Sequence, residues 1–269
     1  MAIIFDGKQV AREKERELKK EIKKLRNKKI IPKMVSILVG ENPASKKYLS
    51  LKEEAAERVG VEIEIIKFQS SDQVDQVIKL IRKLNRDKDV HGIMIQLPLP
   101  SSFSNRDRDE IIGVIEKLKD IDGMREDSMY VAPVAKSVLK ALGDAYQYTI
   151  YNREAKVVVV GAKGFVGKKL LNVLKGMDYK VKGVDVDVKD LPSVTKLADI
   201  LISVTGVAGL IDGSMVKNGS VVIDVGSSDG DVVTKEVLRK VKFISPVPGG
   251  VGPLTIYYLL ENLVDAASG

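Results

Sequence analysis

Few residue types in this chain could carry out catalysis, and this limits the possible chemistry. The sequence contains no cysteine and a single histidine, His91. A thiol nucleophile is therefore excluded, and we expect neither a Ser-His triad nor a metal site. His91 stands just before an apolar segment, which favours a structural role for it. Catalysis would then depend on lysine, tyrosine, carboxylate, amide or backbone groups, or on a bound cofactor.

Tyr48 and Lys52 are four residues apart in the segment PASKKYLSLKEEAAERVG. In a helix this spacing puts both side chains on one face. Such a pair can transfer protons if burial lowers the pKa of the lysine toward neutrality. Spacing alone favours an exposed surface pair, so burial would have to decide between the two interpretations.

Three further segments have polar residues or glycines where ligands could bind. Gln96 ends the apolar stretch of GIMIQLPLP, and ligands gather at strand ends in parallel sheets. Asp122 lies in a turn within KDIDGM. The segment SPVPGGVGPLT, from Ser245 to Thr255, is a constrained loop that leads into a helix. This loop could cover a ligand or form a tight crossing between domains.

The segment VVVVGAKGFVGKKL indicates a strand, a glycine turn and a helix. Gly161, Gly164 and Gly167 would allow the backbone to approach a pyrophosphate at the helix N-terminus. Their spacing is G-x-x-G-x-x-G, whereas the common motif is G-x-G-x-x-G. Asp185 ends the next strand, where a carboxylate favours a free ribose 2′-hydroxyl. Lys163 argues for a 2′-phosphate instead, and both residues could also belong to a solvated turn.

The elements that carry these motifs alternate between strands and helices. We expect strands at 33–40, 61–68, 90–97, 156–161, 179–185, 199–204, 220–225 and 241–245, and helices at 6–27, 44–59, 72–85, 106–118, 131–142, 165–174 and 253–267. This alternation predicts a mainly parallel sheet covered by helices. The natural domain boundary lies near residues 122–150.

Composition limits the class of protein further. Hydrophobic residues make up 44% of the chain, which excludes disorder, and no apolar run is long enough to cross a membrane. The formal net charge is +7, but the lysines between Lys14 and Lys33 alternate with glutamates in a helical pattern. This pattern favours a solvated helix face over a nucleic-acid patch. We therefore expect a soluble, cytoplasmic protein that binds neither membranes nor nucleic acid.

These five segments, in this order and at these distances, resemble the bifunctional methylenetetrahydrofolate dehydrogenase/cyclohydrolase (FolD-type) family. The resemblance covers essentially the whole chain. It implies an α/β fold with two domains and usually a homodimer formed through the cofactor domains. The implied folate-binding catalytic domain comprises residues 1–130 and 247–269, and residues 131–246 form a Rossmann-like NAD(P)-binding domain. The last helix would return to the N-terminal domain.

The resemblance also implies two reactions of one-carbon metabolism, which serves purine biosynthesis. A hydride passes from 5,10-methylenetetrahydrofolate to NADP, and the methenyl product is hydrolysed to 10-formyltetrahydrofolate. By the family pattern Lys52 is the general acid/base group and Gln96 holds it through a hydrogen bond. Tyr48 would stack on or align the folate ring. Asp122 would accept hydrogen bonds from the pterin edge.

The resemblance assigns further residues to the two ligands. The other expected folate contacts are Ile95, Leu97, Pro248, Gly249, Gly250, Val251 and Gly252. The expected cofactor contacts are Gly161, Ala162, Lys163, Gly164, Phe165, Val166, Asp185, Thr205, Gly206 and Ser227. The Arg and Ser that commonly follow the first glycine of the turn are absent here, which leaves the cofactor preference open. We expect NADP, from family habit and Lys163, with NAD as the other possibility.

Two alternative functions fit the sequence less well. An NAD-dependent methylenetetrahydrofolate dehydrogenase without cyclohydrolase activity would not need the Tyr48, Lys52 and Gln96 that the chain contains. A basic nucleic-acid-binding protein would need clustered basic residues with interleaved aromatic ones. Aromatic residues make up 5% of the chain and tryptophan is absent, which argues against that function.

Overall fold

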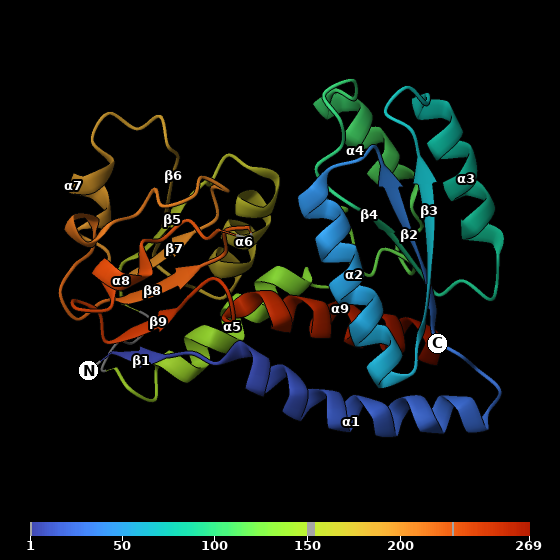
Figure 1. Cartoon of the computed structure of the whole chain (residues 1–269), viewed down its shortest axis with the longest axis horizontal. Coiled ribbons are helices and arrows are strands. Elements are labelled where there is room, and N and C mark those ends of the chain that lie inside the picture. Colours follow the sequence, from blue (N-terminus) through green and yellow to red (C-terminus); the bar gives the residue numbers. More distant parts are fainter. Residues whose placement is uncertain (1, 150–153, 228) are drawn as a thin grey trace. The chain divides into compact units, whose positions relative to one another are not determined.

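The computed structural model describes residues 2–149, 154–227 and 229–269, which form two compact units (Figure 1). The first unit consists of Arg12–Pro133 and Ile256–Gly269. The second unit consists of Met1–Ala11 and Val134–Thr255. Each unit contains its own parallel sheet, which confirms the α/β class expected from the sequence.

The first unit contains a three-stranded parallel sheet in the order β3-β2-β4. The strands are β2 (Lys33–Val39), β3 (Glu62–Phe68) and β4 (Gly92–Ile95), and the helices are α2 (Pro43–Val59), α3 (Val74–Arg86) and α4 (Asn105–Val114). Alternate residues of β2 and β4 pack with α3 and α4 in one core cluster. Met94 points to the opposite face, where it contacts α2. The sheet is therefore covered by helices on both faces, and α2 and α3 lie on opposite sides of it in Figure 1.

Local signals set the ends of α2, the helix that carries Tyr48 and Lys52. The side chain of Asn42 accepts a hydrogen bond from the backbone N–H of Ser45, and Pro43 occupies the first turn. At the other end Gly60 has a φ of +93° and donates its N–H to the carbonyl of Ala56. These caps fix which α2 residues face the sheet.

The second unit contains a six-stranded parallel sheet in the order β1-β9-β8-β7-β5-β6. The strands are β1 (Ile3–Ile4), β5 (Val157–Val160), β6 (Val181–Val184), β7 (Ile200–Ser203), β8 (Val221–Asp224) and β9 (Phe243–Ser245). The helices are α5 (Pro133–Ala145), α6 (Phe165–Gly176), α7 (Leu191–Thr195) and α8 (Thr234–Val237), with a 3₁₀ turn, η1, at Gly213–Met215. The strand order changes direction at β5, which pairs with β6 on one side and β7 on the other. Ligands of such sheets bind at this switch point.

Two long helices contain residues of both units. Helix α1 (Gly7–Asn27) buries Leu18, Ile22 and Leu25 and exposes most of its charged residues, as the amphipathic pattern predicted. Helix α9 (Val251–Ser268) is buried along most of its length, and the ammonium of Lys14 on α1 lies 5.4 Å from the ring centroid of Tyr257 on α9. The last helix therefore packs in the N-terminal part of the fold, as expected.

The two compact units do not coincide with the two expected domains, whose bounds stay a prediction. Strand β1 pairs in parallel with β9, with Ile3 opposite Phe243, so residues 1–11 lie in the second unit. Residues 247–255 likewise belong to the second unit, and the chain enters the first unit again at Ile256. A two-residue strand has no periodicity that a sequence pattern could detect, and α7, α8 and η1 were missed for the same reason. Within the described residues, no helix is long and apolar enough to cross a membrane.

Candidate active site

Lys52 is buried in the first unit, although it is a lysine on a surface helix. Its side chain is 6% exposed. Its Nζ atom donates hydrogen bonds to Oε1 of Gln96 at 2.9 Å and to Sδ of Met94 at 3.0 Å. The same atom lies 5.1 Å from the ring centroid of Tyr48, one helical turn earlier. The spacing alone favoured an exposed surface pair, but Lys52 is buried in the structure.

Burial controls the protonation of this lysine. Removal from water lowers the pKa of Lys52 from 10.5 to about 8, and the nearby charge of Asp122 acts in the opposite direction. Both hydrogen-bond acceptors, an amide oxygen and a thioether, are uncharged. At pH 7 a group with a pKa of about 8 is neutral in about a tenth of the molecules. Lys52 can therefore both accept and donate a proton near neutral pH.

Gln96 is oriented by its own neighbours. Its Nε2 donates to the carbonyl of Leu97 at 2.9 Å, and its backbone N–H donates to the carbonyl of Ile37 at 2.9 Å. The amide therefore presents Oε1, its acceptor, to Lys52. Gln96 is 8% exposed and follows the last residue of β4, Ile95. This arrangement holds the amine of Lys52 at the carboxyl end of the sheet.

Tyr48 is half-buried beside Lys52. Burial raises the pKa of Tyr48 to about 12, and the charge of Asp122 raises it further in the same direction. The phenol therefore stays protonated at physiological pH and offers a ring face and a neutral hydroxyl. Such a group can stack on a flat heterocycle.

Asp122 lies in a turn that two buried polar residues hold in place. The carboxylate of Asp120 accepts the backbone N–H groups of Met124 at 3.0 Å and Arg125 at 2.9 Å. Asn262 on α9 donates to the carbonyl of Ile121 at 2.7 Å. Sequence analysis missed Asp120 and Asn262. A polar residue within the apolar α9 sequence was the available signal for Asn262, and the first aspartate of KDIDGM was the signal for Asp120.

The second unit contains the glycine turn, and its backbone needs these glycines. Gly161 has a φ of +91°, and a Cβ there would lie 2.5 Å from the carbonyl oxygen of Val204. A Cβ on Gly167 would lie 2.1 Å from the carbonyl oxygen of Gly161. Helix α6 begins at Phe165 with Gly164 as its N-cap, and no side chain caps it. A tight glycine turn before an uncapped helix N-terminus fits a dinucleotide pyrophosphate.

The end of β7 lies beside this turn because β5 and β7 are neighbours. Thr205 donates its backbone N–H at 2.6 Å and its hydroxyl at 2.8 Å to Oδ2 of Asp231. Ser203 donates its hydroxyl to the same oxygen at 2.8 Å. Asp231 is fully buried and was not predicted; it fixes the strand end that carries the expected cofactor contacts Thr205 and Gly206.

Ser227, another expected cofactor contact, is exposed and lies three residues after the buried Asp224. Asp224 accepts backbone N–H groups from Gly226, Asp231 and Val232 at 2.8–3.0 Å. Burial raises the pKa of this carboxyl above its usual range. Asp224 therefore shapes the loop on which Ser227 lies, and position 228 lies outside the described residues.

The proline- and glycine-rich loop is held within the second unit. The hydroxyl of Ser245 accepts the N–H of Val251 at 3.1 Å, and the N–H of Gly7 donates to the carbonyl of Gly249 at 2.9 Å. A Cβ on Gly250 would lie 2.2 Å from the hydroxyl oxygen of Ser245. The four catalytic candidates lie together in the first unit, and the contact of this loop with folate stays a prediction.

Two family models together match nearly the whole chain. The tetrahydrofolate dehydrogenase/cyclohydrolase catalytic domain matches residues 5–122, and the NAD(P)-binding domain of the same family matches residues 132–269. The chain belongs to the tetrahydrofolate dehydrogenase/cyclohydrolase family. This confirms the resemblance drawn from the sequence motifs.

Individual members of the tetrahydrofolate dehydrogenase/cyclohydrolase family match over their full length. The Bifunctional protein FolD of Exiguobacterium sibiricum is 37% identical, with 99% of this chain and 100% of that protein covered. The Bifunctional protein FolD of Methanosarcina acetivorans is 36% identical, with coverage of 98% and 96%. The crystal structure of the bifunctional FolD enzyme from Campylobacter jejuni superposes with a TM-score of 0.89 at 34% identity, covering 100% of this chain and 99% of that chain. The Trypanosoma brucei enzyme, complexed with NADP and an inhibitor, has a TM-score of 0.89 at 27% identity, with coverage of 99% and 97%.

His91, the single histidine, has a structural contact. Its Nδ1 accepts the backbone N–H of Lys33 at 3.2 Å, which joins the start of β2 to the segment before β4. Burial, and then the charge of Lys119, lower the pKa of His91. The imidazole is therefore neutral at physiological pH, as a hydrogen-bond acceptor must be.

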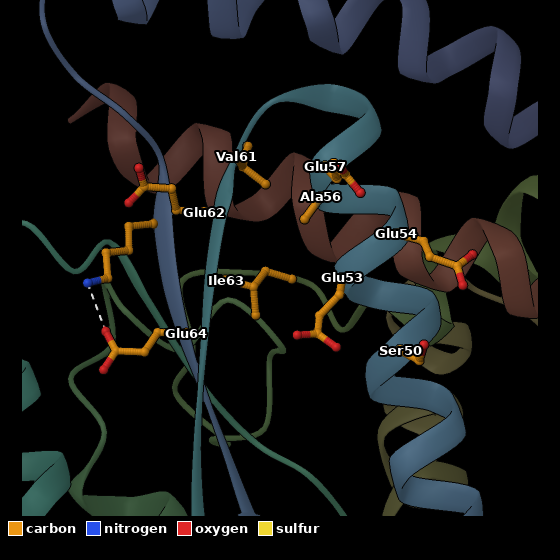
Figure 2. Close-up of a pocket in the computed structure, with 10 residues that line it drawn as sticks. Ser50, Glu53, Glu54, Ala56, Glu57, Val61, Glu62, Ile63 and Glu64 are labelled. Atoms are coloured by element: carbon orange, nitrogen blue, oxygen red, sulfur yellow. Dashed lines mark ion pairs between the residues drawn. The ribbon is translucent and has the colours of Figure 1, made fainter.

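A separate groove of about 550 Å³ lies between α2 and β3 (Figure 2). Its lining residues are Lys33, Ser50, Glu53, Glu54, Ala56, Glu57, Val61, Glu62, Ile63 and Glu64. Lys33 forms an ion pair with Glu64 at 2.8 Å. None of the four catalytic candidates lines this groove, and its excess of carboxylates makes it a poor match for an anionic substrate. The candidate site at Lys52 is therefore distinct from this groove.

Proposed function

We propose that this chain oxidises 5,10-methylenetetrahydrofolate with a nicotinamide dinucleotide and then hydrolyses the 5,10-methenyl product to 10-formyltetrahydrofolate. The observation that carries this proposal is the buried Lys52, hydrogen-bonded to Gln96 and beside Tyr48. Both activities are supported by the family models, which match both halves of the chain. They are also supported by the relatives called Bifunctional protein FolD. The process belongs to one-carbon metabolism.

Lys52 acts as the general acid/base group of the hydrolytic step. The neutral amine takes a proton from the water that attacks the methenyl carbon. The ammonium so formed then gives its proton to the ring nitrogen that leaves this carbon, and the hydroxyl proton of the adduct passes to solvent as the formyl C=O forms. The methenyl substrate is a cation, so its charge lowers the pKa of Lys52 below the value of about 8 in the free protein.

The neighbours of Lys52 bind and orient the folate. Gln96 holds the amine in place, and Tyr48 aligns the pterin through its ring. Asp122 accepts the paired N–H donors of the pterin edge, for which a carboxylate has two oxygens. Ile95, Leu97 and the loop of Pro248, Gly249, Gly250, Val251 and Gly252 supply the remaining folate contacts of this proposal.

The dinucleotide, when bound, accepts the hydride. The glycine turn and the N-terminus of α6 hold its pyrophosphate, and Thr205 at the end of β7 contacts it. Further contacts in this proposal come from Ala162, Lys163, Phe165, Val166, Asp185, Gly206 and Ser227. The protein's own contribution to this step is to bind and orient the two reactants.

We further propose that residues 1–130 and 247–269 form the folate-binding domain and that residues 131–246 form the dinucleotide-binding domain. The protein would work in the cytoplasm as a homodimer formed through its cofactor units, as the family resemblance implies. Sedimentation velocity tests the dimer: a single species of monomer mass at micromolar concentration would contradict it.

The experiment that tests the function compares Lys52→Ala with Lys47→Ala, a variant of an exposed lysine on the same helix. Wild-type protein should reduce a dinucleotide with methylenetetrahydrofolate and should hydrolyse methenyltetrahydrofolate. Lys52→Ala should lower the hydrolysis rate by about 100-fold or more, and Lys47→Ala should leave it unchanged. Full hydrolysis by Lys52→Ala would remove the proposed catalyst. Wild-type protein that oxidises but never hydrolyses would instead be the monofunctional dehydrogenase.

A further inference from the structure

Two aspartates follow the carboxyl end of β6, beside the glycine turn. Strands β5 and β6 pair in parallel, with Val160 opposite Val184, so Asp185 comes directly beside Gly161. In this class of fold the adenosine ribose lies at the end of the second strand of the βαβ unit, which here is β6. The charge at this end therefore meets the ribose 2′-position, which is a hydroxyl in NAD and a phosphate in NADP.

Asp185 is held at this place by two backbone groups. Its Oδ2 accepts the N–H of Lys163 at 2.9 Å, and its Oδ1 accepts the N–H of Val186 at 2.9 Å. Each carboxylate oxygen has a further lone pair, so Asp185 can still accept a hydrogen bond from a ribose hydroxyl. A 2′-phosphate at the same place would meet a fixed negative charge.

Lys163 is the cation in the turn that could hold a 2′-phosphate, but it already has a partner. Its Nζ lies 2.6 Å from Oδ2 of Asp187. The ammonium lowers the pKa of the Asp187 carboxyl, so Asp187 stays ionised at neutral pH. One ammonium and the two carboxylates of Asp185 and Asp187 together leave a net charge of −1 at this corner of the unit.

We propose that this chain binds NAD in preference to NADP, with Asp185 recognising the ribose and Asp187 withholding Lys163 from a 2′-phosphate. This inference rests on the proposed function, since it names the dinucleotide of the same reaction. It differs from the NADP expected from family habit and Lys163, because the structure pairs Lys163 with Asp187.

Calorimetric titration of the full chain, without any folate, measures this preference directly. NAD should bind about tenfold more tightly than NADP or better, a difference of about 1.4 kcal/mol. Equal dissociation constants, or tighter binding of NADP, would overturn the inference.

Two variants test the assigned residues. Asp187→Asn should release Lys163 and tighten NADP binding about tenfold, with little change for NAD. Asp185→Asn keeps an acceptor for the N–H of Lys163. This variant should weaken the binding of NAD and shift the binding preference toward NADP.

Glu154→Gln is the matched control for Asp187→Asn. Glu154 forms an exposed ion pair with Lys180, which precedes β6 at its other end. This variant removes the same charge and the same kind of contact, and it should leave the ratio of the two dissociation constants unchanged. An equal change of the ratio in Glu154→Gln and Asp187→Asn would show an effect of overall charge and would overturn the role of Asp187.

Because the titration contains no folate, it separates this inference from the proposed function. Selective binding of NAD by a chain without folate activity would contradict the proposed function and support the selectivity. Selective binding of NADP by a chain that carries out both folate reactions would contradict the selectivity and support the function.

Discussion

At the residue scale, the catalytic candidate is a lysine whose pKa is lowered by burial and not by a neighbouring cation. The side chain of Lys52 on α2 is buried away from water, and its amine donates to two uncharged acceptors, Gln96 and Met94. Asp122 offsets part of this effect because its negative charge favours the ammonium form. The balance gives a pKa of about 8, close enough to neutrality for proton transfer in both directions.

Gln96→Glu should shift the pH dependence of hydrolysis to higher pH. A carboxylate in place of the amide would lie about 3 Å from the ammonium and would raise the pKa of Lys52. Less neutral amine would then be present at pH 7, so the rate there should fall by about tenfold or more and recover partly as the pH rises. Rates measured across pH 6–10 check this, and a shift toward lower pH would contradict it.

At the element scale, the site depends on helices that hold particular residues against strand ends. Helix α2 brings Lys52 to β4, α6 begins directly after the glycine turn, and α9 reaches the Asp122 turn through Asn262. A single feature fixes each element: a capped start for α2, a crowded glycine for α6, and the buried amide of Asn262 for α9. Substitutions at these positions should therefore alter ligand binding, although the substituted residues do not contact the ligand.

Gly167→Ala should disrupt the turn before α6, because its Cβ would lie 2.1 Å from the carbonyl oxygen of Gly161. We expect a loss of about 1–3 kcal/mol of unfolding free energy and weaker dinucleotide binding. Gly176→Ala in the same helix is the control, since nothing lies within 4 Å of its added Cβ. That variant should be neutral or stabilising by up to about 1 kcal/mol. Denaturant unfolding with both variants tests this, and equal stability of the two would refute the crowding argument.

Asn262→Leu should weaken folate binding from a distance. The variant removes the donor to the carbonyls of Ile121 and Val131 and costs about 1–3 kcal/mol of stability. Because Ile121 precedes Asp122, we also expect a lower affinity for tetrahydrofolate. Asn85→Leu is the control, since Asn85 likewise donates to a backbone carbonyl, but to that of Val114 at the end of α4. If both variants lose stability and neither loses folate affinity, Asn262 has only a structural role.

At the scale of the whole molecule, each of the two units has its own parallel sheet and its own expected ligand. Asp122→Asn tests this division, because it should weaken tetrahydrofolate binding and leave dinucleotide binding unchanged. Asp127→Asn, in the same loop but paired with Arg125 and Lys117, should affect neither ligand. Calorimetric titration of both variants with both ligands measures this, and an equal loss of both affinities for Asp122→Asn would count against a pterin contact.

The sequence predicted most of the fold because strand and helix periods were clear along both halves. Elements such as β2 and α3 lie within one or two residues of their expected ranges. The pairing of β1 with β9 could not be predicted, because two residues have no period and the partner lies far along the chain. Long-range pairing also places residues 1–11 and 247–255 in the second compact unit, which the local sequence pattern could not indicate.

The residues of the candidate site were predicted from the sequence, but their burial and their hydrogen-bond partners were not. Tyr48 and Lys52 had the spacing of an exposed pair, and only the packing of α2 against β4 makes Lys52 a buried amine. Asp120 and Asp231 were missed because a carboxylate in a turn looks the same whether it faces solvent or holds the backbone. Lys163 was interpreted without its partner Asp187, since ion pairs across a turn have no sequence signature.

The pKa of Lys52 in the free protein is the most direct test of the catalytic proposal. Nuclear magnetic resonance titration of lysines labelled at the ε position measures it, with the Lys52 signal assigned by its absence from Lys52→Arg. We predict a midpoint at pH about 8, and a lower midpoint when a methenyltetrahydrofolate analogue is bound. A midpoint at the ordinary lysine value of 10.5, unchanged by the ligand, would contradict the proposal.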